Sequence, residues 1–198
     1  DTDGDDITGY FWRSSIDGNL SNSASFSATN MSVGNHTIYF KVKDNESDDE
    51  WSSEVSSWLK VNSNPVATID SISPQMIDYG STVTFTGHGN DTDGTITGYS
   101  WRSSIDEGLS TSASFSATDM SVGNHTIYFK VKDDNGTWSS EVSSWLEVNS
   151  YPTATIDSIT PQMIDNGSTV TFTGHGNDTD GTITGYSWRS SIDEGLST

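Results

Sequence analysis

Cysteine is absent from the 198 residues, so the chain can form neither a disulfide staple nor a thiolate metal site. Basic residues are scarce, with 8 Lys+Arg against 28 Asp+Glu and a formal net charge of -20. This charge argues against nucleic acid or an anionic membrane as a partner, because both require a basic surface. No apolar run approaches the length of a membrane span and no signal peptide is recognisable, so we expect no membrane insertion in this segment.

Acidic residues are in excess, together with Ser and Thr. An acidic surface favours cations and solubility, and adaptation to high salt is an alternative origin of the same charge. Asn-x-Ser/Thr acceptors are also frequent. Many arise by chance in a Ser/Thr-rich chain, yet together they support a glycosylated, extracellular or cell-surface protein. The nine acceptors are Asn19, Asn30, Asn35, Asn45, Asn90, Asn124, Asn135, Asn166 and Asn177.

One stretch of sequence recurs through the chain. GHGNDTDGTITGYSWRSS spans residues 87–104, it returns complete at 174–191, and a variant opens the chain at 1–15. Trp101 and Trp188 are 188 − 101 = 87 residues apart, whereas Trp12 precedes Trp101 by 101 − 12 = 89, because the loop at 44–50 carries two extra residues. A period of about 87 residues is a whole domain and not a solenoid unit, so the sequence predicts tandem domains.

The repeat divides the chain into one complete and two partial units. Residues 1–63 contain the C-terminal part of a unit, 64–150 a whole unit, and 151–198 the N-terminal part of another. Neither partial unit holds enough strands for a closed sandwich. We therefore expect a longer array of which this is a window. The alternative is that neighbouring chains complete each other's units by strand addition.

Alternating apolar and polar residues, separated by Gly, Asn, Asp and Pro, predict an all-β fold of tandem immunoglobulin-like sandwiches. A polar turn that feeds a Trp-bearing strand is typical of the B–C corner of that fold. The expected strands of the complete unit are Val66–Ile72, Thr82–His88, Gly98–Ser103, Ser112–Ala117, Asn124–Asp133 and Ser139–Val148. The expected inward side chains are Val83, Phe85, Tyr99, Trp101, Ile127, Phe129, Val131, Val142, Leu146 and Val148.

Three segments carry a resemblance to a known family: DTDGTITGYSWRSS, the run GNHTI from Gly123, and Val131-Lys132-Asp133. The unit resembles PKD (polycystic-kidney-disease type) and related Ig-like repeats of bacterial and archaeal surface proteins. It departs from their usual W-x-F-G-D-G run, because Trp101-Arg102-Ser103-Ser104 stands in that place. The resemblance implies an extracellular spacing, adhesion or assembly role and no catalytic chemistry.

The acidic loops are candidate calcium sites. In an Ig-like sandwich the loop at Asn90–Asp93 and the loop at Asp133–Asn135 lie at the same end, where the next linker enters. Their hard oxygen ligands suit Ca²⁺, which could stiffen the joint between repeats. The alternative is that Asp-x-Asp-Gly is ordinary turn chemistry. The candidate ligands are Asn90, Asp91, Asp93, Asp133 and Asp134, with Asp1, Asp3, Asp44, Asp178 and Asp180 from the other units.

Strand parity places all basic residues of the complete unit on or beside one outward face. The candidate interface is Arg102, Tyr128, Lys130, Lys132 and Trp145, with Trp58 as the counterpart of Trp145 in the first unit. This face is interpreted as a surface for self-association, or as a platform for surface glycans built on Trp145 and Tyr128. The alternative is a solvated sheet in which lysine stems cover tryptophan and cross-strand pairs reach Glu141.

No motif indicates an enzyme. The four histidines have no partner motif for a transition metal, no nucleophile elbow is present, and the paired carboxylates fall in turns. His36 and His125 are expected to hydrogen-bond backbone groups at the start of a strand. The leading hypothesis is an extracellular structural protein that forms a stalk, sheath or filament on a prokaryotic surface. The alternative is an adhesin or a carbohydrate-binding array appended to a secreted protein.

Overall fold

The computed structural model describes residues 6–45 and 51–197, and in these the regular elements are all β-strands. The described part of the chain has no helix, and hence no apolar helix of membrane-spanning length. Asp1 and Asp3, two of the predicted calcium ligands, lie outside the described residues. The chain divides into two compact units: the first is Asp1–Pro65, Asn90–Thr97 and Lys132–Trp138, and the second is Val66–Gly89, Gly98–Val131 and Ser139–Thr198.

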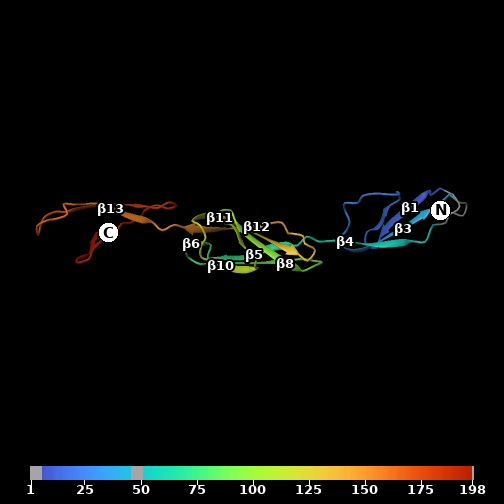
Figure 1. The fold of residues 1–198 in the computed structure, drawn as a ribbon, viewed down its shortest axis with the longest axis horizontal. Coiled ribbons are helices and arrows are strands. Elements are labelled where there is room, and N and C mark those ends of the chain that lie inside the picture. The colour runs from blue at the N-terminus through green and yellow to red at the C-terminus, as the bar shows by residue number, and fades with distance from the viewer. Residues whose placement is uncertain (1–5, 46–50, 198) are drawn as a thin grey trace. The chain divides into compact units, whose positions relative to one another are not determined.

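Two sheets build the central sandwich, drawn in green and yellow in Figure 1. A three-stranded sheet has the order β10 (Ser114–Ala117), β7 (Val83–Asn90) and β5 (Val66–Ser73). A five-stranded sheet has the order β6 (Met76–Asp78), β12 (Val142–Asn149), β11 (Gly123–Asp133), β8 (Ile96–Ser103) and β9 (Glu107–Ser110). The strands β11 and β12 pair antiparallel, whereas β6 joins β12 in parallel. The predicted all-β sandwich is confirmed.

The core lies between these sheets. Trp101 on β8 is 1% exposed, and its ring stacks on Phe129 with centroids 4.2 Å apart and lies 5.8 Å from the ring of Phe85. Phe85 and Phe129 are 0% exposed, as the alternation predicts. Gly87 makes room for the stack, since a β-carbon there would lie 2.7 Å from Phe129 Cε1 and 2.9 Å from Trp101 Cζ2.

The sequence missed two short strands, β6 and β9. The pairing of β9 with β8 follows a tight turn in which Glu107 has a φ of 58°, an unusual angle for a residue other than glycine. The partner of β6 is β12, in which Glu147 pairs with Met76 across 147 − 76 = 71 positions, and no local sequence pattern indicates such a pairing. The last predicted strand also begins later than expected, at Val142. Before it, Trp138 forms an isolated bridge with Lys132, and the Ser139 N–H donates to the Val131 carbonyl oxygen at 2.8 Å.

The N-terminal strands of the first unit form a sheet that resembles the five-stranded sheet of the central sandwich. Its order is β2 (Gly18–Ser21), β1 (Gly9–Ser14), β3 (Gly34–Lys43) and β4 (Val55–Val61). The register agrees with that of β9, β8, β11 and β12: Trp12 pairs with Ser21 as Trp101 does with Ser110. In this unit Leu59 on β4 is 40% exposed, while its equivalent Leu146 on β12 is 0% exposed.

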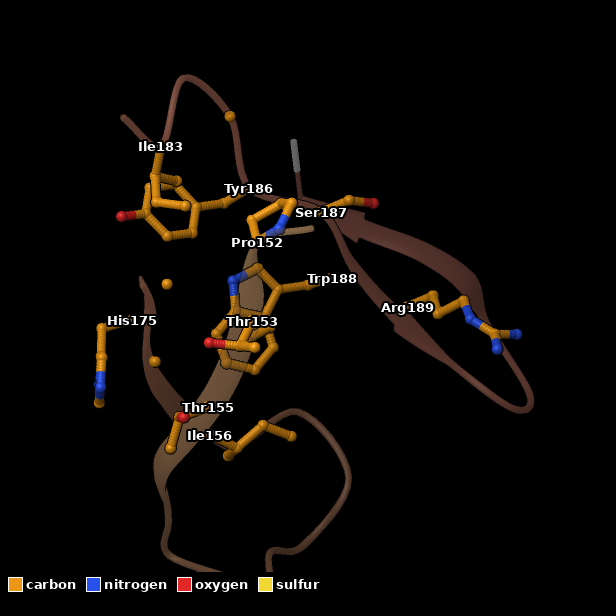
Figure 2. A pocket seen from close by; sticks show the side chains of 14 residues that line it. Pro152, Thr153, Thr155, Ile156, His175, Ile183, Tyr186, Ser187, Trp188 and Arg189 are labelled. Atoms are coloured by element: carbon orange, nitrogen blue, oxygen red, sulfur yellow. The ribbon is translucent and has the colours of Figure 1, made fainter. Parts of the chain in front are cut away.

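The C-terminal residues form two hairpins, β13 (Thr153–Thr160) with β14 (Thr171–Asn177) and β15 (Trp188–Ser190) with β16 (Glu194–Ser197). A cavity of about 490 Å³ lies between β13, β14 and residues 183–189 (Figure 2). Trp188 borders it and packs against Gly174, just as Trp101 packs against Gly87. In the central sandwich the stacking partner of the tryptophan is Phe129 of β11. The cavity is therefore lined by residues that include the equivalents of Gly87 and Trp101 in the core of the central sandwich.

Gly87→Ala should destabilise the central sandwich. The added methyl group meets two buried rings and the Thr68 backbone oxygen at 2.9 Å, so overpacking should cost about 1–3 kcal/mol of unfolding free energy. Gly108→Ala is the matched control, because a β-carbon at Gly108 meets nothing within 4 Å. Urea unfolding followed by tryptophan fluorescence measures both, and equal effects would contradict the packing described.

Candidate functional site at the linker loops

Three segments of the first unit meet at one place: the linker after β4, the loop after β7 and the loop after β11. The backbone N–H of Ser63 in the linker donates to Asp93 Oδ1 at 3.0 Å, and Thr92 Oγ1 donates to Ser63 Oγ at 3.0 Å. From the other loop, Asp134 Oδ1 accepts a hydrogen bond from the Thr95 N–H at 3.3 Å. The two acidic loops thus lie together, and both contact the linker that follows β4.

Asp133 is the buried anchor of this site. Its side chain is 1% exposed and accepts hydrogen bonds from Asn62 Nδ2 at 2.8 Å and from the Thr137 N–H at 2.7 Å. Burial raises the pKa of this carboxyl, but the hydrogen bonds from Asn62 and the backbone outweigh burial, so the pKa of Asp133 lies below its ordinary value. Asn135 adds two contacts, donating to Asn62 Oδ1 and accepting from Lys60 Nζ at 3.1 Å.

Two carboxylate oxygens at this site lack partners. Among the described residues, Asp91 Oδ2 and Asp93 Oδ2 are buried and accept no hydrogen bond. A β-carbon at Gly94 would overlap Asp134 Oδ1 and lie 2.6 Å from Asp91 Oδ2, so both oxygens converge over this glycine. Buried oxygens without partners are costly, and a hard cation relieves that cost.

The donor set fits a calcium ion in kind. Across residues 6–45 and 51–197, no three His, Asp or Glu side chains are arranged to hold a metal by themselves. A cation here would also need hydroxyl, amide or backbone oxygens, and Ca²⁺ accepts all of them. The structure thus supplies orphaned carboxylate oxygens but no complete cage of carboxylates.

The same contacts recur in the second unit. The backbone N–H of Ser150 donates to Asp180 Oδ2 at 2.9 Å, and Ser150 Oγ donates to Asp178 Oδ1 at 3.1 Å and lies 3.0 Å from Thr179 Oγ1. The hydrogen bonds from Ser150 hold the pKa of Asp180 below its ordinary value. Asn149 follows the pattern of Asn62 only in part, since its amide donates to Asp78 Oδ1 at 3.2 Å.

Two other candidate ligands lie apart from these contacts. Asn90 is exposed at the end of β7. Asp44 follows β3, and its backbone oxygen accepts a hydrogen bond from Thr8 Oγ1. The structure therefore groups Asp91, Asp93, Asp133 and Asp134 at one linker and Asp178 and Asp180 at the other.

The outward face of the five-stranded sheet carries cations that contact acidic and aromatic side chains. Arg102 grips Glu141 with two hydrogen bonds, at 2.9 and 2.6 Å, and its guanidinium lies 3.7 Å from the centroid of the Tyr128 ring. These hydrogen bonds raise the pKa of Arg102 and lower that of Glu141. Arg13, Glu54 and Tyr39 repeat the arrangement in the first unit.

The tryptophan rings on this face differ in whether a cation covers them. Lys132 lies 5.9 Å from the ring centroid of Trp138. Trp145 and Trp58, by contrast, are 50% and 82% exposed. The predicted interface residues do share one face, but the cations of this face already contact other side chains of the chain. The two exposed tryptophans are therefore the side chains of this face that remain open to a partner.

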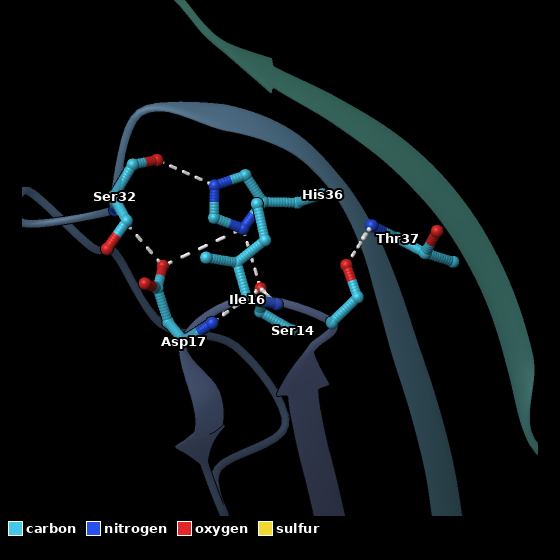
Figure 3. Close-up of polar contacts among 7 residues, drawn as sticks. Ser14, Ile16, Asp17, Ser32, His36 and Thr37 are labelled. Atoms are coloured by element: carbon cyan, nitrogen blue, oxygen red, sulfur yellow. Dashed lines mark hydrogen bonds and ion pairs between the residues drawn. The ribbon is translucent and has the colours of Figure 1, made fainter.

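A buried polar lock joins β1 to β3 (Figure 3). Ser14 Oγ and His36 Nδ1 lie 2.6 Å apart, and His36 Nε2 lies 2.7 Å from the Ser32 carbonyl oxygen. The same hydroxyl accepts from the N–H groups of Ile16 and Asp17, which fixes the turn. Ser14 and His36 are 3% and 2% exposed, so this hydrogen-bonded pair is buried between the strand and the turn that it fixes. Ser103 and His125 repeat it.

Sequence reasoning placed the histidines correctly at the start of the strand and missed their serine partners. It also missed the linker residues Asn62, Ser63 and Ser150, which lie opposite the predicted carboxylates. One signal was available: Asn-Ser precedes Asn64-Pro65 and Tyr151-Pro152 at the same position of successive repeats.

The Asp133 contacts should give the linker site an acid-sensitive stability. Because the folded-state pKa of Asp133 is lowered, its contribution is complete above the ordinary value of about 3.9 and is lost as the pH falls through the lowered pKa. Melting temperature measured between neutral and strongly acidic pH should fall less steeply for Asp133→Asn than for the parent chain. Asp119→Asn, at an exposed loop position, is the control. An unchanged acid dependence in Asp133→Asn would contradict the assignment.

Comparison with known proteins finds one matching family model. Residues 67–144 match the family model of the PKD domain. No curated protein matches the chain. Among solved structures, the fibronectin(III)-like modules of Clostridium thermocellum CbhA are 17% identical with a TM-score of 0.42, covering 74% of this chain and 80% of that one.

Two solved PKD domains are also similar. The PKD1 domain of Vibrio anguillarum Epp is 24% identical with a TM-score of 0.36, covering 44% of this chain and 99% of that one. The PKD1 domain of the Vibrio cholerae metalloprotease PrtV is 22% identical with a TM-score of 0.34, covering 42% and 98%. At these scores the structural likenesses say nothing about function. The match to the PKD domain model covers residues 67–144, which is less than half of the chain.

Proposed function

We propose that the chain is an extracellular structural repeat protein that forms a stalk, sheath or filament on a prokaryotic cell surface. PKD domains are commonly found in extracellular proteins, often as structural or adhesion modules, and are generally not catalytic. We propose further that the chain consists of units 1–63, 64–150 and 151–198.

The observation that carries this proposal is the recurrence of the linker contacts. Ser63 meets Asp93, and Ser150 meets Asp180, 150 − 63 = 87 residues later. In both places the linker backbone N–H is held by an aspartate of the following acidic loop. A flexible tether between independent binding modules would not need such a contact, whereas a load-bearing array does, because only held linkers transmit direction from one repeat to the next.

Calcium at the acidic loops is part of the same proposal. Asp91, Asp93 and Asp134 would hold it at the first linker, and Asp178 and Asp180 at the second. The ion would neutralise carboxylates that otherwise repel one another and would give partners to the buried oxygens of Asp91 and Asp93. Such an ion would supply positive charge and would link carboxylates of different loops.

A second candidate function is adhesion to surface glycans. The exposed indoles of Trp58 and Trp145 favour it, since rings on a flat sheet can stack on sugars. The structural role remains the main proposal, because the linker contacts have no purpose in glycan binding.

Removing the linker aspartates should loosen the array. In Asp93→Ala/Asp180→Ala the N–H groups of Ser63 and Ser150 lose their acceptors, so both amides should exchange with solvent faster, and small-angle scattering should indicate a more flexible particle than the parent chain. Asp119→Ala removes a carboxylate from an exposed loop position and should leave both readouts unchanged. A parent chain that already scatters as a freely jointed coil would refute the structural proposal.

Calcium should raise the melting temperature, and a chelator should reverse the rise. Asp91→Asn/Asp93→Asn should abolish the response at the first linker, because it removes charge while keeping side-chain size. Magnesium is the matched control ion, since it demands a tighter octahedral site. A melting temperature unaffected by chelator would show that the bound-ion idea is wrong while leaving the linker contacts intact.

A further inference from the structure

Trp145 and Trp58 are the open rings on the outward faces of β12 and β4. Other aromatic rings of these faces are covered by cations, with Arg102 over Tyr128 and Lys41 5.0 Å from the centroid of Trp51. Trp145 and Trp58 have no ring or cation partner among the described residues, and half or more of each side chain is exposed. The same indole is exposed at the equivalent position of two repeats, which singles these rings out as the place on each face that a further group could cover.

An acceptor asparagine lies beside each ring. On β11, Asn124 pairs with Glu147 and Thr126 pairs with Trp145, so Asn124 is the diagonal neighbour of Trp145. On β3, Asn35 pairs with Lys60 and Thr37 with Trp58, in the same register. Diagonal neighbours on one face of an antiparallel pair are within reach of long side chains.

Both acceptors face solvent. His125, between Asn124 and Thr126, is 2% exposed and points inward, so its two neighbours point outward with Trp145. Asn35 and Asn124 are exposed, and neither amide has a hydrogen-bond partner among the described residues. Asn135 differs, because its amide nitrogen is already engaged by Asn62 and Asp134 at the linker.

We propose that Asn35 and Asn124 are N-glycosylation sites whose first sugar packs on Trp58 and Trp145. The pyranose ring of an N-linked sugar presents an apolar C–H face, and a neighbouring indole offers a flat partner for it. The chemical step is ordinary transfer: the asparagine Nδ2 forms a bond to the sugar C1, the bond from C1 to the phosphate oxygen of a polyprenyl-phosphate-linked donor breaks, and the lipid phosphate leaves as the amide loses a proton. The transferase and the lipid-linked donor come from the cell.

The glycan then acts as the cover of this face. It shields the indole from water and from other copies of the chain, and it directs sugar outward from the side of β11 on which Asn124 is exposed. The inference rests on the proposed extracellular location, because such transferases act on exported chains.

The experiment secretes the chain from a eukaryotic cell that transfers N-linked glycans. Mass spectrometry after enzymatic deglycosylation in heavy-oxygen water measures occupancy at each acceptor. We expect Asn35 and Asn124 to be occupied, Thr126→Ser to keep the glycan at Asn124, and Thr126→Ala to lose it. Asn124→Gln should lower the melting temperature of the glycosylated chain by about 4 °C, the shift expected of one stacking contact in a domain of this size.

Trp145→Ala provides the decisive comparison. In that background Asn124→Gln should no longer change the melting temperature, and in unglycosylated chain from bacteria it should change nothing in either background. An unoccupied Asn124 overturns the inference, as does an equal effect of Asn124→Gln with and without Trp145. Binding of a free polysaccharide to Trp145 of the glycosylated chain also overturns it, because the ring would have to be open. Occupied Asn124 without coupling to Trp145 leaves the proposed extracellular location standing.

Discussion

The stack of Trp101 on Phe129 is the contact on which the sandwich depends. The indole spans the gap between the two sheets and touches residues of both, so neither sheet can shift without exposing it. Gly87 allows the close approach, because any side chain there would push the sheets apart. The equivalent rings are less well covered elsewhere in the described residues: Phe26, which lies against Trp12 in the first unit, is 39% exposed, and Phe172 beside Trp188 is 41% exposed.

A completed core fixes the ends of its strands, and the acidic loops inherit their positions from those ends. Asp91 and Asp93 follow β7, and Asp133 ends β11, so the same packing that buries Phe85 and Phe129 brings these carboxylates together. Their mutual repulsion is offset locally by donors, above all the N–H groups of Ser63 and Thr137 and the amide of Asn62. The linker therefore supplies hydrogen bonds to carboxylates in the acidic loops. The order of the linker thus depends on the same packing that stabilises the central sandwich.

The strands and the inward residues could be predicted from the sequence because they follow a local rule. Alternation of period two and turn residues located six strands and the burial of Trp101, Phe85 and Phe129. The strands β6 and β9 could not be found this way: each is three or four residues long and is fixed by its partner and by its turn. The acidic half of the linker site was predicted from loop positions in the fold. Ser63 and Ser150 were missed, because their main contact is made by a backbone N–H and the repeated Asn-Ser is the one mark that they leave in the sequence.

The net charge of the chain adds a second constraint on the linker loops. A chain of net charge -20 repels itself, and every added repeat adds to the repulsion. Lys60 reaches the first linker, where Asn135 accepts its hydrogen bond, but one cation does not balance the four aspartates grouped there. Arg13 and Arg102 are already paired with Glu54 and Glu141 on the sheet face, and charges further apart than about 8 Å are screened at physiological ionic strength. The carboxylates of the linker loops must therefore be neutralised where they stand. Backbone donors satisfy part of that need, and the oxygens of Asp91 and Asp93 that accept no hydrogen bond mark the remainder. Under the proposed function a divalent cation meets this need, because one ion neutralises two carboxylates and also holds the linker in place.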